Sequence, residues 1–140
     1  MSDDNLRKIT LTRTGERDYE AENPRGGRLT FGEGQSADFT PVELLLTAIA
    51  GCSAIDVDYL TTRLAEPTQF DVAAEAEKLR DHEGNHLGEV RITFTVRFPA
   101  GPEGDAARTR LPDAVAKSRD RLCTVSRTVQ LPTPVDYVIT

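Results

Sequence analysis

The sequence has no tryptophan, and aromatic residues make up only 6% of its 140 residues. Proteins that stack single-stranded bases rely on such side chains, so their scarcity argues against that class. The chain is also short of positive charge, with 17 Lys and Arg against 23 Asp and Glu and a formal net charge of −6. Nucleic-acid binding needs a basic surface that neutralises phosphates, and we therefore expect no nucleic-acid partner.

Long apolar segments and nucleotide-binding motifs are lacking as well. The longest apolar stretch, residues 44–55, is far short of the roughly 20 residues that a membrane span needs. The N-terminus, Met-Ser-Asp-Asp-Asn-Leu-Arg-Lys, has no apolar segment typical of a secretory signal. Glycine-rich phosphate loops and a Gly-x-Ser-x-Gly elbow are absent. We expect a cytoplasmic protein of one domain, residues 1–140, with no membrane partner and no cofactor.

The patterns that are present predict an α+β fold that begins with a β-meander. Short alternating segments around Ile9, Tyr19 and Leu29 are separated by turns, which is typical of small antiparallel strands. Alternating apolar residues at 70–76 and 90–98 predict two further strands, joined as a β-hairpin by the polar loop 81–86. Residues 99–104 are expected to form a loop.

Residues 41–64 give the strongest helix signal. Thr40 is a typical N-cap, Pro41 suits the first helical position, and Glu43 completes a capping box. Nine of the twelve residues 44–55 are apolar and surround the helix, which predicts burial on every side. Such a helix is about 36 Å long. One domain of this size can hardly cover it, so we expect a partner subunit.

Helical and extended patterns follow in the last third of the chain. Residues 111–122 keep helical spacing with Pro112 near the helix start, which predicts a second helical region. Residues 123–129 predict a short further helical piece. Alternation of Val135, Tyr137 and Ile139 predicts a C-terminal strand.

The two cysteines are the obvious candidates for chemistry. Cys52 falls midway along the long helix, and Cys123 begins the last helical piece. A free cysteine commonly packs as a small buried hydrophobe, and that interpretation stays open for Cys52. Because a permanent disulfide is not expected in the cytoplasm, a bond between the two would be transient and redox-active.

Reactivity of either cysteine depends on the thiolate, which a nearby cation stabilises. Asp56, one turn after Cys52, opposes ionisation, so a reactive Cys52 needs a cation from elsewhere in the protein. Cys123 is flanked by Arg121 and Arg127 and is electrostatically better placed. Physical reasoning from these residues alone does not rank the two thiols.

Histidines and carboxylates offer less specific signals. His82 and His86 with the two cysteines nominally make a zinc set, but the cysteines lack the short spacing of zinc sites. We interpret both histidines as surface loop residues and expect no metal. Glu43 lies nine residues before Cys52, on about the opposite helix face, and capping explains it at least as well as catalysis does.

Two segments carry a family resemblance: Phe39-Thr-Pro-Val-Glu-Leu-Leu-Leu-Thr-Ala-Ile-Ala-Gly-Cys52-Ser-Ala-Ile-Asp-Val57 and Arg121-Leu-Cys-Thr-Val-Ser-Arg-Thr-Val129. Together they resemble the OsmC/Ohr family, whose α+β fold has the predicted order of elements. The resemblance implies an intertwined homodimer with the long helices at its centre. It also implies a thiol-dependent peroxidase that reduces organic hydroperoxides.

The resemblance further implies a role for each thiol. Cys52 would attack the hydroperoxide and become a sulfenic acid, and Cys123 would resolve it as a Cys52–Cys123 disulfide that an external dithiol reduces. The alternative is a non-catalytic dimer of the same fold, which binds an apolar small molecule or senses oxidants while Cys52 is merely packed.

Two further roles are implied by the family pattern. Its catalytic arginine comes from an N-terminal β-turn, where Arg17 is the best match and Arg25 and Arg28 are further candidates. Its active-site glutamate directly follows the proline. Here Val42 occupies that position and Glu43 is shifted by one residue, a rotation of about 100° on a helix.

Overall fold

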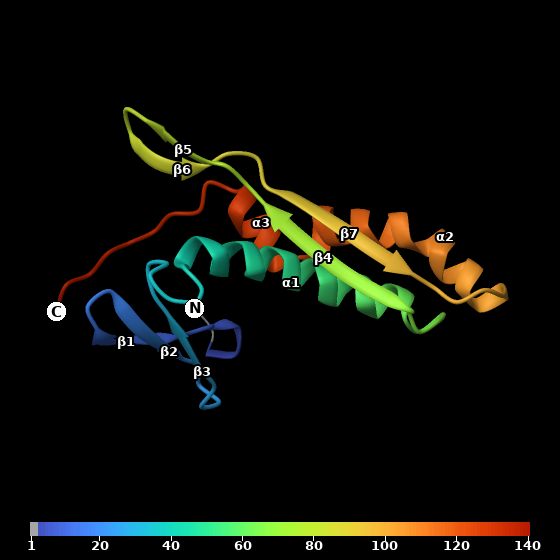
Figure 1. Ribbon diagram of the computed structural model, residues 1–140, viewed down its shortest axis with the longest axis horizontal. Helices are drawn as coiled ribbons and strands as arrows, with labels where there is room; N and C mark the ends of the chain where they lie inside the picture. The colour runs from blue at the N-terminus through green and yellow to red at the C-terminus, as the bar shows by residue number, and fades with distance from the viewer. Residues whose placement is uncertain (1–2) are drawn as a thin grey trace. The chain divides into compact units, whose positions relative to one another are not determined.

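A computed structural model describes residues 3–140 and has the predicted α+β architecture (Figure 1). The chain forms two compact units, the first ending at Leu45 and the second comprising Leu46–Thr140. The assignment of residues 1–140 to one domain stays a prediction.

The first unit holds a three-stranded antiparallel sheet in the order β1-β2-β3, which confirms the predicted meander. Its elements are the 3-10 turn η1 Asp3–Asn5 and the strands β1 Thr10–Gly15, β2 Asp18–Glu22 and β3 Arg28–Phe31. Tyr19 pairs with Phe31 across β2 and β3, and their rings stack with centroids 5.7 Å apart. The β1–β2 turn places Arg17 in the left-handed region, with φ of 60°.

Helix α1, Pro41–Thr61, begins as the sequence predicts. The Thr40 N–H donates to Glu43 Oε1 at 2.8 Å, and the Glu43 N–H donates to Thr40 Oγ1 at 3.2 Å. These reciprocal bonds confirm the capping box, which satisfies two N–H groups that the helix itself leaves unpaired.

The packing of α1 differs from the prediction of burial on every side. Its buried residues form one stripe at four-residue spacing: Ile49, Ser53, Val57 and Thr61. Ile55 and Tyr59 are 60% and 76% exposed, because a single chain packs against only one face of the helix. The partner subunit stays a prediction.

Helix α1 is also apolar enough, by length and composition alone, to cross a membrane, with a mean hydropathy of 1.4 over 18 residues. The apolar part of this helix is therefore longer than the stretch of residues 44–55 that the sequence analysis considered. The core helix of a folded protein can have the same length and apolar composition, so this property does not by itself identify a membrane protein. The absence of a membrane partner stays a prediction.

The second unit contains two separate two-stranded sheets. The first pairs β4, Gln69–Glu75, with β7, Arg91–Arg97, in antiparallel register, and α2 runs along them (Figure 1). The second pairs β5, Lys78–Asp81, with β6, Gly84–Leu87. The antiparallel pairing of β4 with β7 confirms the predicted hairpin of residues 70–76 and 90–98, but residues 81–86 are not all loop, because Asp81 and residues 84–86 lie on β5 and β6. Asp81 accepts the N–H groups at the turn, which lets this polar segment form a hairpin of its own.

Three helical elements follow: α2 Pro102–Lys117, the π-helical turn η2 Ser118–Leu122 and α3 Thr124–Gln130. The predicted helix start near Pro112 is wrong, because α2 begins at Pro102 and contains Pro112. The predicted loop at 99–104 is correspondingly shorter and covers only residues 99–101. The first half of α2 packs through the small residues Gly104 and Ala107, so it shows no large apolar periodicity. The predicted short piece at 123–129 is confirmed as α3.

The core of the second unit joins β7 and α2. Val96, Phe98 and Ala107 are buried there, with Phe94 and Leu111 packed against them.

The predicted C-terminal strand is not formed within the described residues 3–140. Val135, Tyr137 and Ile139 are 71%, 88% and 98% exposed. A strand needs a neighbouring strand for its backbone hydrogen bonds, and no segment of the described chain pairs with this one.

Candidate active site

The two cysteines, 71 residues apart in sequence, meet in the second unit. Cys52 lies in the middle of α1, and Cys123 is the N-cap of α3. Their sulfurs and a carboxylate oxygen of Asp56 all lie within 4.8 Å of one another. Both thiols are free, Cys52 being half-buried and Cys123 fully buried. The arrangement therefore offers one thiol to an incoming molecule and keeps the second directly beside it.

The N-terminal turn of α3 supplies backbone hydrogen bonds to both sulfurs. The N–H of Ser126 donates to Cys123 Sγ at 3.2 Å, with the sulfur acting as the cap of the helix. The N–H of Val125 bonds to the sulfur of Cys52 and lowers the pKa of this thiol. This hydrogen bond favours the thiolate of Cys52 over its thiol.

The pKa of Cys52 is nevertheless raised overall. Burial is the largest cause, and the neighbouring Cys123 and the negative charge of Asp56 act in the same direction. Among residues 3–140, none of the groups that shift this pKa is a cation. The thiol form therefore dominates at neutral pH unless a positive charge approaches, as expected from the position of Asp56 on the helix.

Asp56 is held in place by a residue that sequence reasoning missed. The hydroxyl of Ser118 donates to Asp56 Oδ2 at 2.9 Å, and Ser118 is only 1% exposed. Its sequence signal is faint, because a single serine on an apolar helical stripe resembles a small core residue. Ser118 also begins η2, and its carbonyl accepts the N–H of Cys123 at 3.0 Å.

Arg17 and Glu43 belong to the first unit, and the cysteines to the second. Arg17 bonds through Nε to Glu33 Oε1 at 2.7 Å and pairs with Glu16 at 2.9 Å. The side chain of Glu43 is engaged in the capping box with Thr40. The catalytic roles assigned to Arg17 and Glu43 stay predictions.

Two of the other predicted candidates, Arg28 and His86, have local partners of their own. Arg28 pairs with Glu20 at 3.4 Å. The Nδ1 atom of His86, on β6, lies 3.7 Å from an oxygen of Asp81. Within residues 3–140, the potential ligand group that contains both cysteines includes Asp56 and neither histidine. Both histidines are exposed, as predicted, but His86 lies on β6 and not in a loop.

A cavity of about 600 Å³ borders residues next to the cysteines, although neither cysteine is among its lining residues. Apolar side chains make up most of its wall, among them Ile49, Ile92, Phe94, Val115 and Val129. Ser53 and Ser126 also line it; the first follows Cys52 in sequence and the second bonds to Cys123. Its volume lies in the range of small-molecule sites in proteins.

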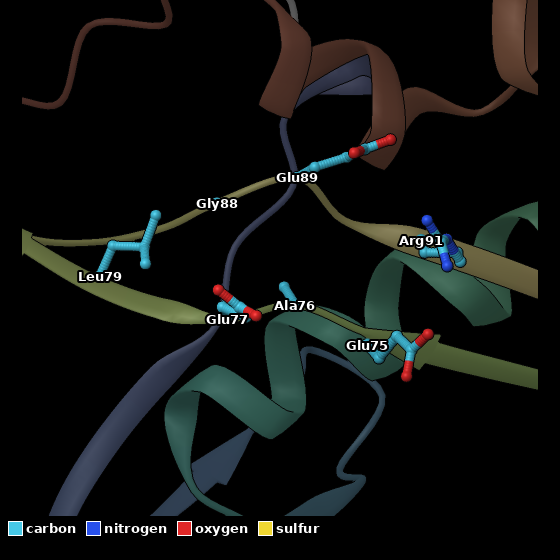
Figure 2. A pocket seen from close by; sticks show the side chains of 7 residues that line it. All are labelled: Glu75, Ala76, Glu77, Leu79, Gly88, Glu89 and Arg91. Atoms are coloured by element: carbon cyan, nitrogen blue, oxygen red, sulfur yellow. The ribbon is translucent and has the colours of Figure 1, made fainter.

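A second cavity, of about 520 Å³, lies where the chain leaves β4 and enters β7. Figure 2 shows its lining, in which Glu75, Glu77 and Glu89 come from the two segments and Arg91 supplies a positive charge. Its lining residues include neither cysteine.

The fold and the site define a class of α+β proteins in which a cysteine on a long helix meets a second cysteine near the C-terminus. A family model described as OsmC-like protein matches residues 32–138. The chain therefore belongs to the OsmC-like family. An uncharacterised protein of Mycobacterium tuberculosis is 30% identical over 136 residues, covering 96% of each chain.

Solved structures show the same fold. A hypothetical protein from Aquifex aeolicus superposes with a TM-score of 0.73 at 20% identity, over 92% of this chain and 90% of that one. The organic hydroperoxide resistance protein OhrB of Bacillus subtilis superposes with a TM-score of 0.56 at 15% identity, over 91% and 93%.

Proposed function

We propose that this protein is a thiol-dependent peroxidase that reduces organic hydroperoxides through Cys52 and Cys123. The observation that carries the proposal is that a half-buried thiol, Cys52, lies beside a fully buried one, Cys123. The two sulfurs and a carboxylate oxygen of Asp56 lie within 4.8 Å of one another. Membership of the OsmC-like family supports it, as does the fold shared with a protein named for hydroperoxide resistance. The proposed setting is the detoxification of hydroperoxides during oxidative stress.

The first step oxidises Cys52. Its thiolate attacks the terminal oxygen of the hydroperoxide, the O–O bond breaks, and the departing alkoxide takes a proton to become an alcohol. Cys52 is left as a sulfenic acid. The more exposed position of Cys52 suits this encounter, and the adjoining apolar cavity suits the organic part of the substrate.

The second step uses Cys123. Its thiolate attacks the sulfur of the Cys52 sulfenic acid, a disulfide forms, and the hydroxyl leaves as water. An external dithiol then reduces the disulfide by exchange and becomes a disulfide itself. The net reaction converts a hydroperoxide and a dithiol into an alcohol, water and a disulfide. Burial of Cys123 keeps this thiol from reacting with peroxide before Cys52 does.

Activation of Cys52 requires a positive charge, because burial, Cys123 and Asp56 all raise the pKa of its thiol. We assign this role to Arg17, which lies in the β1–β2 turn, with Glu43 as the accompanying carboxylate. The proposed assembly is a cytoplasmic homodimer. The exposed apolar side chains of Ile55 and Tyr59 on α1 support this assembly, since large exposed apolar residues favour association.

A second candidate is a non-catalytic OsmC-like dimer that binds an apolar small molecule or senses oxidants. Two observations favour it: the raised pKa of Cys52, and the mostly apolar cavity of about 600 Å³ beside the site.

One experiment separates the two candidates. Fully reduced protein is mixed with one equivalent of cumene hydroperoxide and its intact mass is measured within seconds. A peroxidase loses two hydrogens as the disulfide forms, Cys52→Ser shows no change, and Cys123→Ser gains oxygen on Cys52 instead. If the wild-type mass is unchanged after minutes, Cys52 is a packed thiol and the binding function is the better description.

A further inference from the structure

The reduced cysteine site presents three metal-ligand side chains on one small surface. Cys52 and Asp56 are four residues apart on α1 and therefore share a helix face. Cys123 reaches the same point from the N-cap of α3. We propose that the reduced protein binds a thiophilic divalent cation such as Zn²⁺ through Cys52 Sγ, Cys123 Sγ and a carboxylate oxygen of Asp56.

The spacing suits such an ion. Two sulfurs at about 2.3 Å from a tetrahedral zinc lie about 3.8 Å apart, and carboxylate oxygens bind at about 2.0–2.2 Å. The three ligand atoms already lie within 4.8 Å of one another. Side-chain rotations that move these atoms by about 1 Å would bring all three to bonding distance from one ion. Two thiolates and a carboxylate are also a donor set that zinc accepts.

The groups behind the ligands hold them in place. The hydroxyl of the buried Ser118 bonds to one oxygen of Asp56, and the N–H groups of Val125 and Ser126 bond to the two sulfurs. Outer contacts of this kind orient metal ligands and strengthen binding. They come from the chain itself and leave the half-buried side of Cys52 as the entry for an ion and for a water in the fourth position.

Electrostatics also favour a cation. The carboxylate of Asp56 lies within 4.8 Å of both sulfurs and offers an anionic oxygen to a cation placed between them. Metal ligands bind in their deprotonated forms, so both thiols release their protons when a divalent ion binds. With three protein ligands and a water, the site resembles open zinc sites rather than closed structural ones.

The consequence for chemistry rests on the proposed function. If Cys52 and Cys123 form a disulfide during turnover, the same sulfurs are unavailable to a metal in the oxidised state. Metal binding and peroxide reduction then exclude each other, and Zn²⁺ inhibits the reduced enzyme. The binding itself needs only the reduced thiols.

The test is a titration of the fully reduced protein with Co²⁺, followed by displacement with Zn²⁺. Bound Co²⁺ is detected by thiolate charge-transfer absorption in the near ultraviolet. We expect this band in the wild type, its loss in Cys52→Ser and Cys123→Ser, and its disappearance when Zn²⁺ is added. A wild type without the band overturns the proposal.

Asp56 is tested against a matched carboxylate on the same helix. We expect Asp56→Asn to weaken Co²⁺ binding at least about tenfold, since even residues that only support a ligand change affinity by that much. Asp58→Asn, on an exposed residue two positions later, should bind like the wild type. Equal losses in both variants contradict the role of Asp56. Should Asp56→Asn fail to fold, Asp56→Glu, which keeps a carboxylate, is expected to retain the band, and a folded Asp56→Glu without it overturns the proposal.

The two proposals fail separately. If the protein binds Co²⁺ but does not react with cumene hydroperoxide, the proposed metal site stands and the proposed peroxidase function is wrong. If the protein forms the disulfide with peroxide but shows no thiolate band, the peroxidase function stands and the metal site is wrong.

Discussion

The buried hydroxyl of Ser118 donates a hydrogen bond of 2.9 Å to Asp56, a partner 62 residues earlier in the chain. The contact joins the start of η2 to the C-terminal half of α1 and fixes the carboxylate beside Cys52. Through one bond it links the geometry of the π-helical turn to the charge that Cys52 experiences.

Replacing Ser118 with alanine should destabilise the protein. The variant loses a hydrogen bond to a charged group, which is worth about 1.5–3 kcal/mol in the free energy of unfolding. Urea denaturation measures the difference. Ser36→Ala, which loses only the exposed hydrogen bond from the Asp38 N–H to the Ser36 hydroxyl, should cost less, about 0.5 kcal/mol. If the two variants are equally stable, the bond to Asp56 contributes nothing measurable.

Removing the charge of Asp56 should lower the pKa of Cys52. The carboxylate is one of the groups that raise this pKa, so Asp56→Asn makes the thiolate easier to form. The measurement is the rate of alkylation by iodoacetamide against pH, in a Cys123→Ser background where Cys52 is the only thiol. The midpoint should move to lower pH in Asp56→Asn and stay in place in Asp58→Asn.

The raised pKa of Cys52 also makes stability depend on pH. Because the pKa is higher in the folded than in the unfolded chain, the folded state favours the protonated thiol. The resulting stabilisation is complete below the unfolded pKa and is lost as pH rises through the folded pKa. We expect unfolding free energies measured across this alkaline range to fall more steeply for the wild type than for Cys52→Ser.

The proposed role of Arg17 is tested by peroxide kinetics. Arg17→Ala should slow oxidation of Cys52 by about 10²-fold, the usual cost of losing one stabilising donor at a reacting centre. Stopped-flow measurements on Arg25→Ala and Arg28→Ala decide whether another arginine of the first unit acts instead. Arg80→Ala, on β5, is the control. A wild-type rate in Arg17→Ala refutes the assignment.

Glu43 can be a cap, a catalytic carboxylate or both, and two substitutions separate these roles. Glu43→Gln keeps a side chain that can complete the capping box but removes the charge. We expect its stability to match the wild type while its peroxide reaction slows. Glu43→Ala should lose about 1 kcal/mol of stability in thermal or urea denaturation. A Glu43→Gln protein with full peroxide activity assigns the residue to capping alone.

Elements whose hydrogen bonds lie within a few residues of one another could be predicted from the sequence. The capping box of Thr40 and Glu43 predicted the start of α1 correctly, because both hydrogen bonds lie within four residues. The turn that begins at Asn23 in the first unit could be predicted for the same reason, because the Asn23 side chain accepts hydrogen bonds from the N–H groups of Arg25 and Gly27, two and four residues later.

Elsewhere the decisive contacts were not local. The start of α2 was missed because Gly104 and Ala107 pack closely without giving a large apolar period. The alternation of Val135, Tyr137 and Ile139 predicted a strand, but a strand also needs a neighbouring strand to pair its backbone hydrogen bonds, and the alternation does not show whether one is present. In the site, the two thiols were identified from sequence, but the contact between Ser118 and Asp56 depends on the folded path of the whole second unit.

The π-helical turn η2 determines the direction of Cys123. Its closing bond runs from the N–H of Cys123 to the carbonyl of Ser118, five residues back, so the turn holds one residue more than an α-helical turn. Deleting any one residue between them would turn the sulfur by about 100° about the helix axis. The number of residues in this segment is therefore more restrictive than the identity of the side chains between Ser118 and Cys123, because losing one residue would move the Cys123 sulfur away from Cys52.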